Sequence, residues 1–151
     1  YFWSMKKPRT FKVLVVSFFM IFNSGCGDEK HCQQYSDVPV NITIYPNSTE
    51  YQELNTVNGW LYLTAPRPSK GIIVYRTGLD HFRAYDRTCP HDPENSDAVL
   101  QVDKETVLFA YDTVCGSRFI LTSGYPLDGP AKCPMIQYRT SYDGNRLRIF
   151  N

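Results

Sequence analysis

The chain has 151 residues, which is long enough for one domain with a hydrophobic core and too short for two ordinary domains. Aromatic residues make up 15% of the sequence, with 11 Tyr and 9 Phe, and most of them stand near β-branched residues. This composition favours strands over helices. The formal net charge is +1, and Lys and Arg are scattered along the chain rather than gathered in a stripe. We therefore expect no nucleic-acid partner.

Residues 1–25 have the pattern of an export signal. Four cations between residues 6 and 12 precede an almost continuous apolar stretch over residues 13–22. A basic segment, a short apolar segment and small residues at the exit are typical of a secretory signal peptide. Ten helical residues span about 15 Å, roughly half the hydrocarbon core of a bilayer, so we do not expect a transmembrane anchor. Because residues 1–25 hold four cations and no anion, their removal would lower the net charge from +1 to −3.

Cys26 follows Ser24-Gly25 directly, at the place where bacterial lipoproteins carry their lipidated cysteine. The next four residues, Gly27-Asp28-Glu29-Lys30, resemble the acidic signal that directs some Gram-negative lipoproteins to the cell surface. We therefore predict a lipid anchor on Cys26 and a tether over residues 26–38. The predicted location is the cell envelope, at the outer membrane or cell surface of a Gram-negative bacterium. The alternative is an ordinary cleaved signal with Cys26 in a disulfide.

Residues 39–151 are predicted to form a single domain of short strands. Residues 71–76 and 81–86 flank a Gly-containing turn, and Asp143-Gly144 joins residues 135–141 to residues 146–150, so both pairs are predicted hairpins. No segment carries a helical period over ten residues. Short strands separated by turn residues predict an antiparallel all-β domain. The other predicted strands cover residues 41–45, 60–63, 99–102, 107–110 and 118–121.

Two of the predicted hairpins lead into loops that contain cysteine. The first loop holds Cys89-Pro90-His91, and the second runs from Asp112 to Phe119 with Cys115-Gly116-Ser117 inside it. This order of motifs resembles the Rieske family, in which a Cys-x-His box precedes a Cys-x-x-His box and then Gly-Ser-x-Phe. Gly129-Pro130-Ala131 and the closing hairpin agree with the family pattern further along. The resemblance covers roughly residues 60–150.

The resemblance implies a Rieske-like antiparallel β-sandwich or barrel with a smaller, loop-bearing subdomain at about residues 87–135. It also implies four candidate ligands. Cys89 and His91 match the first box, whereas Asp112 stands where the family has Cys and Cys115 stands where it has His. The family binds one iron of a 2Fe–2S cluster with two Cys and the other with two His. This chain would then offer Cys89 with Asp112, and His91 with Cys115.

Several arrangements of these residues stay open. A disulfide between Cys89 and Cys115 would clamp the two loops together in an oxidising compartment. Cys133 lies in a third loop, at residues 129–135, so it is an alternative partner for either of these cysteines. Cys32 in the tether could then pair with the cysteine that is left over.

Two metal-bound alternatives accompany the disulfide. A 2Fe–2S cluster with the atypical ligands would be harder to reduce, because the extra thiolate adds negative charge. Carboxylate is also a hard ligand in a site built for soft thiolates. The signal segment lacks the Arg pair of the export route that carries folded proteins, which argues further against a cluster. The third alternative is a single zinc ion, since Cys89, His91, Asp112 and Cys115 are all zinc ligands in proteins.

From these features we predict an exported Rieske-fold lipoprotein that acts as a non-catalytic accessory or binding protein without a cofactor. No Ser–His–Asp set or phosphate-binding Gly loop is present, so we expect no enzymatic activity of its own. Its partners would be the membrane, through the lipid anchor, and a protein that contacts the loops at residues 87–93, 112–119 and 129–135. The alternatives are electron transfer to a redox partner through an atypical 2Fe–2S cluster, and binding of zinc.

Overall fold

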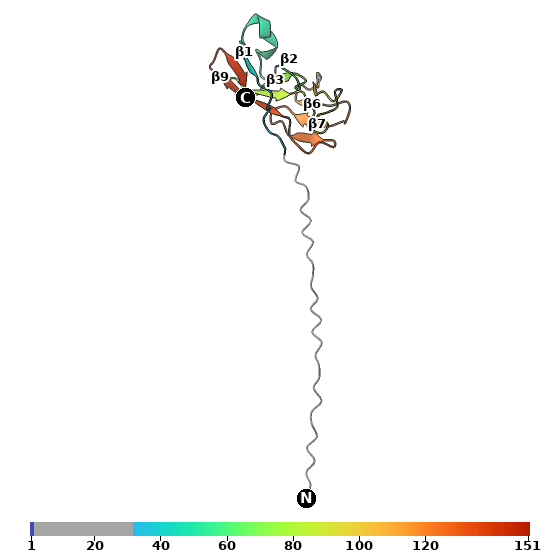
Figure 1. The fold of residues 1–151 in the computed structure, drawn as a ribbon. Helices are drawn as coiled ribbons and strands as arrows, with labels where there is room; N and C mark the ends of the chain where they lie inside the picture. The colour runs from blue at the N-terminus through green and yellow to red at the C-terminus, as the bar shows by residue number, and fades with distance from the viewer. Residues whose placement is uncertain (2–31) are drawn as a thin grey trace. The chain divides into compact units, whose positions relative to one another are not determined.

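The computed structural model describes Tyr1 and residues 32–151, and the latter belong to one unit (Figure 1). The predicted signal peptide, apart from Tyr1, and the predicted lipidation site Cys26 lie outside the described residues. Within the described part of the chain, no helix has the length and apolar character needed to cross a bilayer.

Two antiparallel sheets form the unit that begins at residue 32. The larger has six strands in the order β1-β10-β9-β4-β3-β2, and the smaller has four in the order β5-β6-β7-β8. One short 3-10 helix, η1, lies between β1 and β2. This arrangement confirms the predicted all-β class, with a smaller sheet that carries loops. The bounds are β1 Asn41–Ile44, η1 Thr49–Leu54, β2 Trp60–Leu63, β3 Ile72–Arg76, β4 Phe82–Asp86, β5 Gln101–Val102, β6 Phe109–Tyr111, β7 Arg118–Ile120, β8 Pro126–Asp128, β9 Gln137–Tyr142 and β10 Leu147–Phe150.

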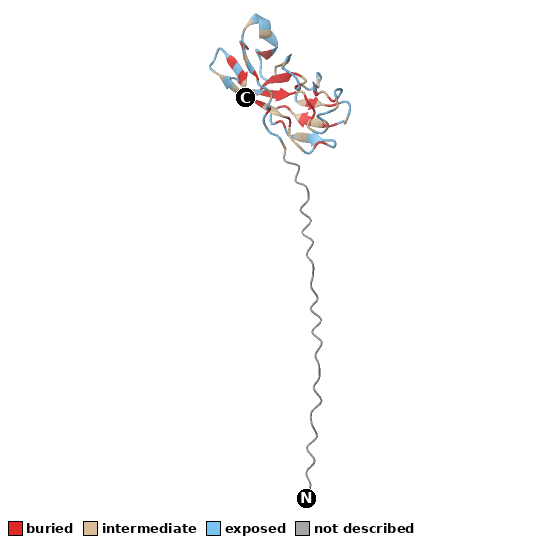
Figure 2. Cartoon of the chain, in the orientation of Figure 1, coloured by how far each residue is buried: buried red, intermediate tan, exposed pale blue. Residues whose placement is uncertain are grey.

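Strand β3 shows how the large sheet is buried on both faces. All five of its residues are buried, and the first four, residues 72–75, form an unbroken run of apolar and aromatic residues (Figure 2). Because side chains alternate along a strand, Ile73 and Tyr75 enter one hydrophobic cluster, whereas Ile72 and Val74 enter another. A strand covered on both faces needs this continuous apolar pattern rather than strict alternation.

The two clusters show what covers each face of the large sheet. The cluster around Ile73 also contains Val102, Ala110 and Phe119, so the small sheet packs against this face. The cluster around Ile72 and Val74 contains residues from η1 and β10 instead. Since β3 and β10 are not neighbours in the sheet order but share this cluster, the large sheet curves around its own core.

The small sheet differs in detail from the predicted strands. The strands predicted at residues 99–102 and 107–110 are observed as β5 and β6, of two and three residues. The turn between them extends further than expected, because Val107 adopts a positive φ of 52° and donates its N–H to the Asp103 carbonyl. Strand β8 was not predicted. It begins at Pro126, which has no N–H to donate to a neighbouring strand, and it lies at the edge of the sheet.

Residues 32–38, predicted as the end of the tether, contact the domain. Cys32 forms a disulfide with Cys133. Tyr35 makes an isolated parallel bridge to Gln137, and Ser36 donates its N–H to the Gln137 carbonyl at 2.9 Å. The segment is polar and has no periodicity, so nothing in its side-chain pattern indicates these contacts, which run largely through the backbone and one disulfide.

Candidate functional site

The first loop of the candidate site leaves the end of β4. Asp86, the last residue of β4, is buried, and its Oδ1 accepts a hydrogen bond from the Thr88 N–H at 2.8 Å. Its Oδ2 accepts one from the Tyr138 hydroxyl at 2.9 Å. The same loop is tied to the start of the small sheet, since Leu100 donates its N–H to the Arg87 carbonyl at 2.7 Å. These bonds fix the backbone that presents Cys89.

The second loop is a tight turn between β6 and β7. The Asp112 N–H bonds to the Ser117 carbonyl, and the Gly116 N–H bonds to the Asp112 carbonyl, each at 2.9 Å. The Asp112 side chain also accepts the Val114 N–H at 3.0 Å through Oδ1. Gly116 has a φ of +75°, a conformation that suits glycine at the end of such a turn. Asp112 therefore holds the turn that carries Cys115.

The third loop packs directly against the second. The Ala131 N–H donates to the Ser117 hydroxyl at 3.0 Å, and the Cys115 thiol lies 3.1 Å from the same oxygen. Gly129 also lies against this turn, because a Cβ at that position would be only 2.5 Å from the Ser117 Cα. The buried Ser117 hydroxyl thus connects the third loop to Cys115. The sequence indicated Ser117 only as part of the Gly-Ser-x-Phe motif and not as a residue of the site.

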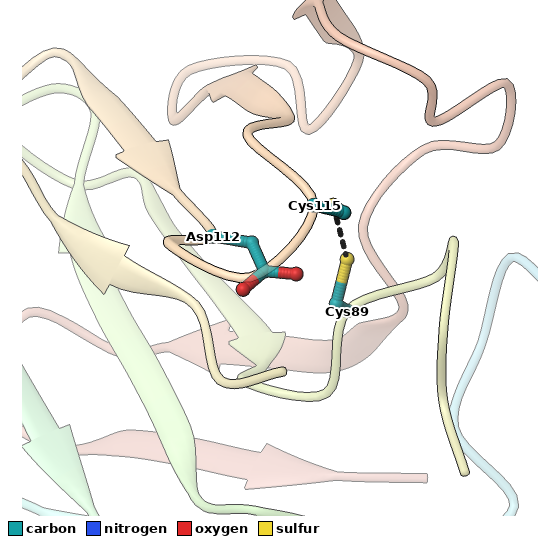
Figure 3. Close-up of side chains that lie close together, drawn as sticks. All are labelled: Cys89, Asp112 and Cys115. Carbon is teal, nitrogen blue, oxygen red and sulfur yellow. Dashed lines mark hydrogen bonds between the residues drawn. The ribbon is translucent and has the colours of Figure 1, made fainter. Parts of the chain in front are cut away.

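Three of the four predicted ligand residues meet between these loops. The candidate ligand atoms of Cys89, Asp112 and Cys115 all lie within 4.8 Å of one another, and the two sulfur atoms are 3.6 Å apart (Figure 3). Cys89 is fully buried and Asp112 is 1% exposed, whereas Cys115 is half-buried. We call these three residues the loop cluster.

His91, the fourth predicted ligand, does not join the loop cluster. Its residue is exposed, two positions beyond the buried Cys89. Spacing along the chain placed Cys89 and His91 in one box, but the direction of the His91 side chain depends on how its loop folds after Pro90. The group that forms between the loops therefore contains two thiols and a carboxylate but no imidazole.

The described cysteines divide into one disulfide and two thiols. Cys133 pairs with Cys32, which excludes the alternative pairings of Cys133 with Cys89 or Cys115. Cys89 and Cys115 are free thiols that form a hydrogen bond with each other. Their sulfur separation of 3.6 Å is well beyond the 2.03–2.05 Å of a disulfide bond.

Burial and close polar neighbours set the electrostatics of the loop cluster. Burial, followed by the adjacent Asp112 carboxylate, raises the pKa of Cys89 to about 12. Burial alone would raise the pKa of Asp112 as well, but the adjacent Cys89 thiol and the Val114 N–H outweigh it and lower this pKa. Among the described residues, Asp112 Oδ2 and the Tyr85 hydroxyl are the buried side-chain polar atoms without a hydrogen-bond partner.

No family model and no curated protein matches this chain. Among solved structures, it is similar to the ferredoxin of carbazole 1,9a-dioxygenase from Nocardioides aromaticivorans IC177, with a TM-score of 0.47 and 19% identity over 75% of this chain and 97% of that one. It is also similar to a chain in a complex of reduced oxygenase and oxidised ferredoxin in carbazole 1,9a-dioxygenase. That match has a TM-score of 0.46 and 16% identity over 76% of this chain and 94% of the other. Sequence identity is low in both matches, and neither match gives information on the candidate ligand residues.

The residues at the loops do not fit a standard Rieske cluster. Such a cluster has two cysteines on one iron and two histidines on the other. Here the donors that come together are two thiols and a carboxylate, and His91 lies outside the group. The arrangement instead offers a buried, thiol-rich site at the meeting point of three loops.

Proposed function

We propose that this chain is an exported, lipid-anchored accessory protein that uses a Rieske-type β-scaffold to present a binding surface, without electron transfer through a standard 2Fe–2S cluster. The observation that carries the proposal is the composition of the loop cluster. It combines Cys89, Asp112 and Cys115, and His91 is exposed outside it. A site without a histidine pair lacks the ligands that distinguish a Rieske centre from other iron–sulfur centres.

The proposed binding surface is formed by the loops at residues 87–93, 112–119 and 129–135. Val114, beside Cys115, is 47% exposed, and Leu127 of β8 is 49% exposed. Leu127 lies near the second loop because its neighbour Asp128 pairs with Arg118, the first residue of β7. Exposed apolar side chains on loops that a buried scaffold holds in place are a common feature of protein contact surfaces.

Metal analysis and a visible spectrum test this function on protein purified anaerobically from its own cell envelope. We expect colourless protein without acid-labile sulfide. Iron near two atoms per chain, with sulfide and visible charge-transfer bands, would overturn the proposal. Mass spectrometry of the mature protein tests the anchor, with acylated Cys26 as the expected result and an unmodified Cys26 as the contrary one.

A cross-linking comparison tests the binding surface itself. A photoreactive residue at Val114 should give a discrete cross-linked product in cells, whereas one at Leu79 should not. Leu79 is a suitable control because it is 75% exposed and lies in the β3–β4 turn rather than in the three loops. Equal cross-linking from both positions would contradict a surface centred on the loops.

Electron transfer is the second candidate function. It is favoured by the two free thiols that face each other across the loops, because iron requires free thiolates. In that case the protein would be a low-potential carrier, since thiolate and carboxylate ligands add negative charge to the centre. The metal analysis described above separates the two candidates.

A further inference from the structure

The loop cluster has the chemistry of a site for a single metal ion. We propose that Cys89, Asp112 and Cys115 bind one thiophilic divalent cation of the zinc type, with three protein ligands and a fourth position open. The inference rests on the proposed function in one respect, namely that no two-iron cluster uses the same residues. It extends that function by assigning a metal ion to the site and by excluding His91 from the residues that bind it.

The spacing of the two thiols agrees with one shared ion. Two thiolates bound to one tetrahedral zinc ion at about 2.3 Å have their sulfur atoms roughly 3.8 Å apart. The sulfur atoms of Cys89 and Cys115 are 3.6 Å apart across the two loops (Figure 3). The loops therefore hold the two sulfur atoms close to the separation that a single ion requires.

The Asp112 carboxylate supplies an independent indication. Its residue is 1% exposed, Oδ1 accepts the Val114 N–H, and Oδ2 has no hydrogen-bond partner. Neither of the ion pairs among the described residues involves Asp112. A buried carboxylate oxygen that accepts no hydrogen bond keeps its lone pairs available to a cation. A cation held by the neighbouring thiolates would give Oδ2 a partner, whereas a Cys89–Cys115 disulfide would leave it without one.

Ser117 completes the surroundings of the site on the Cys115 side. Its hydroxyl oxygen accepts the Ala131 N–H at 3.0 Å and lies 3.1 Å from the Cys115 sulfur. Once Cys115 is a thiolate, the hydroxyl proton of Ser117 is free to be donated to it. Hydrogen bonds of this kind orient metal ligands and tune their basicity. The third loop thus helps to position a ligand that the second loop carries.

The exposure of the three residues indicates where the open position lies. Cys89 and Asp112 are buried, and Cys115 is half-buried, so the site faces solvent on the Cys115 side. Structural zinc sites have four protein ligands, whereas sites with three keep a position for water or for a donor atom of a bound molecule. The open position would therefore lie at the surface proposed to contact a partner, next to Val114.

Titration of the full chain with Co²⁺ tests the site. The protein should keep the Cys32–Cys133 disulfide, and mass spectrometry should first show that Cys89 and Cys115 are free thiols. We expect one Co²⁺ per chain with thiolate-to-cobalt charge-transfer absorption, and loss of this absorption when Zn²⁺ displaces the cobalt. Absence of uptake by protein with both thiols free would overturn the inference. So would isolation of the protein from its envelope with Cys89 and Cys115 in a disulfide.

Two variants test the ligands, and a third serves as the control. Loss of an outer-shell partner costs about 10- to 100-fold in metal affinity, so loss of a ligand in Cys115→Ser or Asp112→Asn should weaken Co²⁺ binding at least about 100-fold. Asp112→Asn keeps nearly the same side-chain shape, and circular dichroism of both variants checks that they fold. His91→Ala is the matched control, with affinity unchanged. A comparable loss in His91→Ala would overturn the three-ligand assignment.

The outcomes separate this inference from the proposed function. Two irons per chain with acid-labile sulfide would overturn both. Failure to bind Co²⁺ or Zn²⁺ would overturn the single-ion site but leave a metal-free binding protein intact. One ion per chain in protein from the cell envelope, with the expected response of the variants, would support both.

Discussion

The two sheets of this protein are stabilised in different ways. The six-stranded sheet has strands of four to six residues, and its strand β3, between β4 and the edge strand β2, is buried on both faces. The four-stranded sheet has strands of two or three residues, and its edge strand β8 is largely exposed. Its geometry depends on the turns between the strands and on Phe119, which packs into the cluster shared with the large sheet.

This difference shows how the molecule can combine a rigid scaffold with a variable site. Strand pairing and two hydrophobic clusters determine the large sheet, so changes there affect global stability. The site loops are held by side-chain hydrogen bonds from Asp86, Asp112 and Ser117, which act locally. Residues at such loops can therefore change while the scaffold stays the same.

The largest expected effect is the loss of Phe119, which couples the two sheets. Phe119→Ala should destabilise the protein by about 3–5 kcal/mol, because it removes a fully buried ring from the shared cluster. Ile149→Ala, in the other cluster, should cost about 2–5 kcal/mol. Urea denaturation measures both. Thiol labelling in native buffer distinguishes them, since only Phe119→Ala should expose Cys89, and equal labelling would contradict the proposed coupling.

The next largest effect concerns the disulfide that joins residues 32–38 to the third loop. The paired change Cys32→Ser and Cys133→Ser opens a loop with a sequence separation of 101 and should cost about 2–5 kcal/mol. Thermal unfolding with and without reductant measures the loss, and reductant should have no effect on the variant. An unchanged melting temperature in the variant would mean that residues 32–38 and β9 hold together without the bond.

A smaller effect is expected from two glycines, one in each part of the molecule. Gly129→Ala combines a φ of +86° with a Cβ only 2.5 Å from the Ser117 Cα, so it should cost about 1–3 kcal/mol. Gly144→Ala in the β9–β10 turn has a φ of +92° but nothing within 4 Å of the new Cβ, so the strain of the positive φ is its main cost. Urea midpoints of the two variants should rank in this order, and the reverse ranking would contradict the close packing of the third loop on the second.

The smallest effect is a pH dependence at Asp112. Since its folded pKa lies below the ordinary value of 3.8, ionised Asp112 contributes stability that is present above about pH 5 and is lost as the pH falls through the lowered pKa. Asp112→Asn removes this contribution. Urea midpoints of the wild-type protein and the variant are measured in the presence of chelator. Their difference should be constant from about pH 5 to 7 and should shrink at lower pH. A difference that grows in acid would contradict the assigned direction.

Local patterns in the sequence were sufficient to predict the hairpins. In residues 71–86, two runs rich in apolar and aromatic residues flank a turn with Gly78, and the observed register runs from Ile72 opposite Asp86 to Arg76 opposite Phe82. Asp143-Gly144 likewise gave the turn between β9 and β10. Strand β8 was not predicted in this way, since it begins with proline and pairs with β7 over only three residues with an irregular register. The same limit applied to Tyr35, whose bridge to Gln137 spans most of the chain.

The sequence by itself determined the all-β class, the two long hairpins and the positions of Cys89, Asp112 and Cys115 in neighbouring loops, because turn residues and alternation act over a few positions. The tertiary structure alone decided that Cys32 pairs with Cys133, that the other two cysteines form no disulfide and that His91 is exposed outside the loop cluster. These outcomes depend on distances between segments far apart in sequence and on the path of the loop after Pro90. No local pattern encodes them, since packing between sheets fixes where each loop ends.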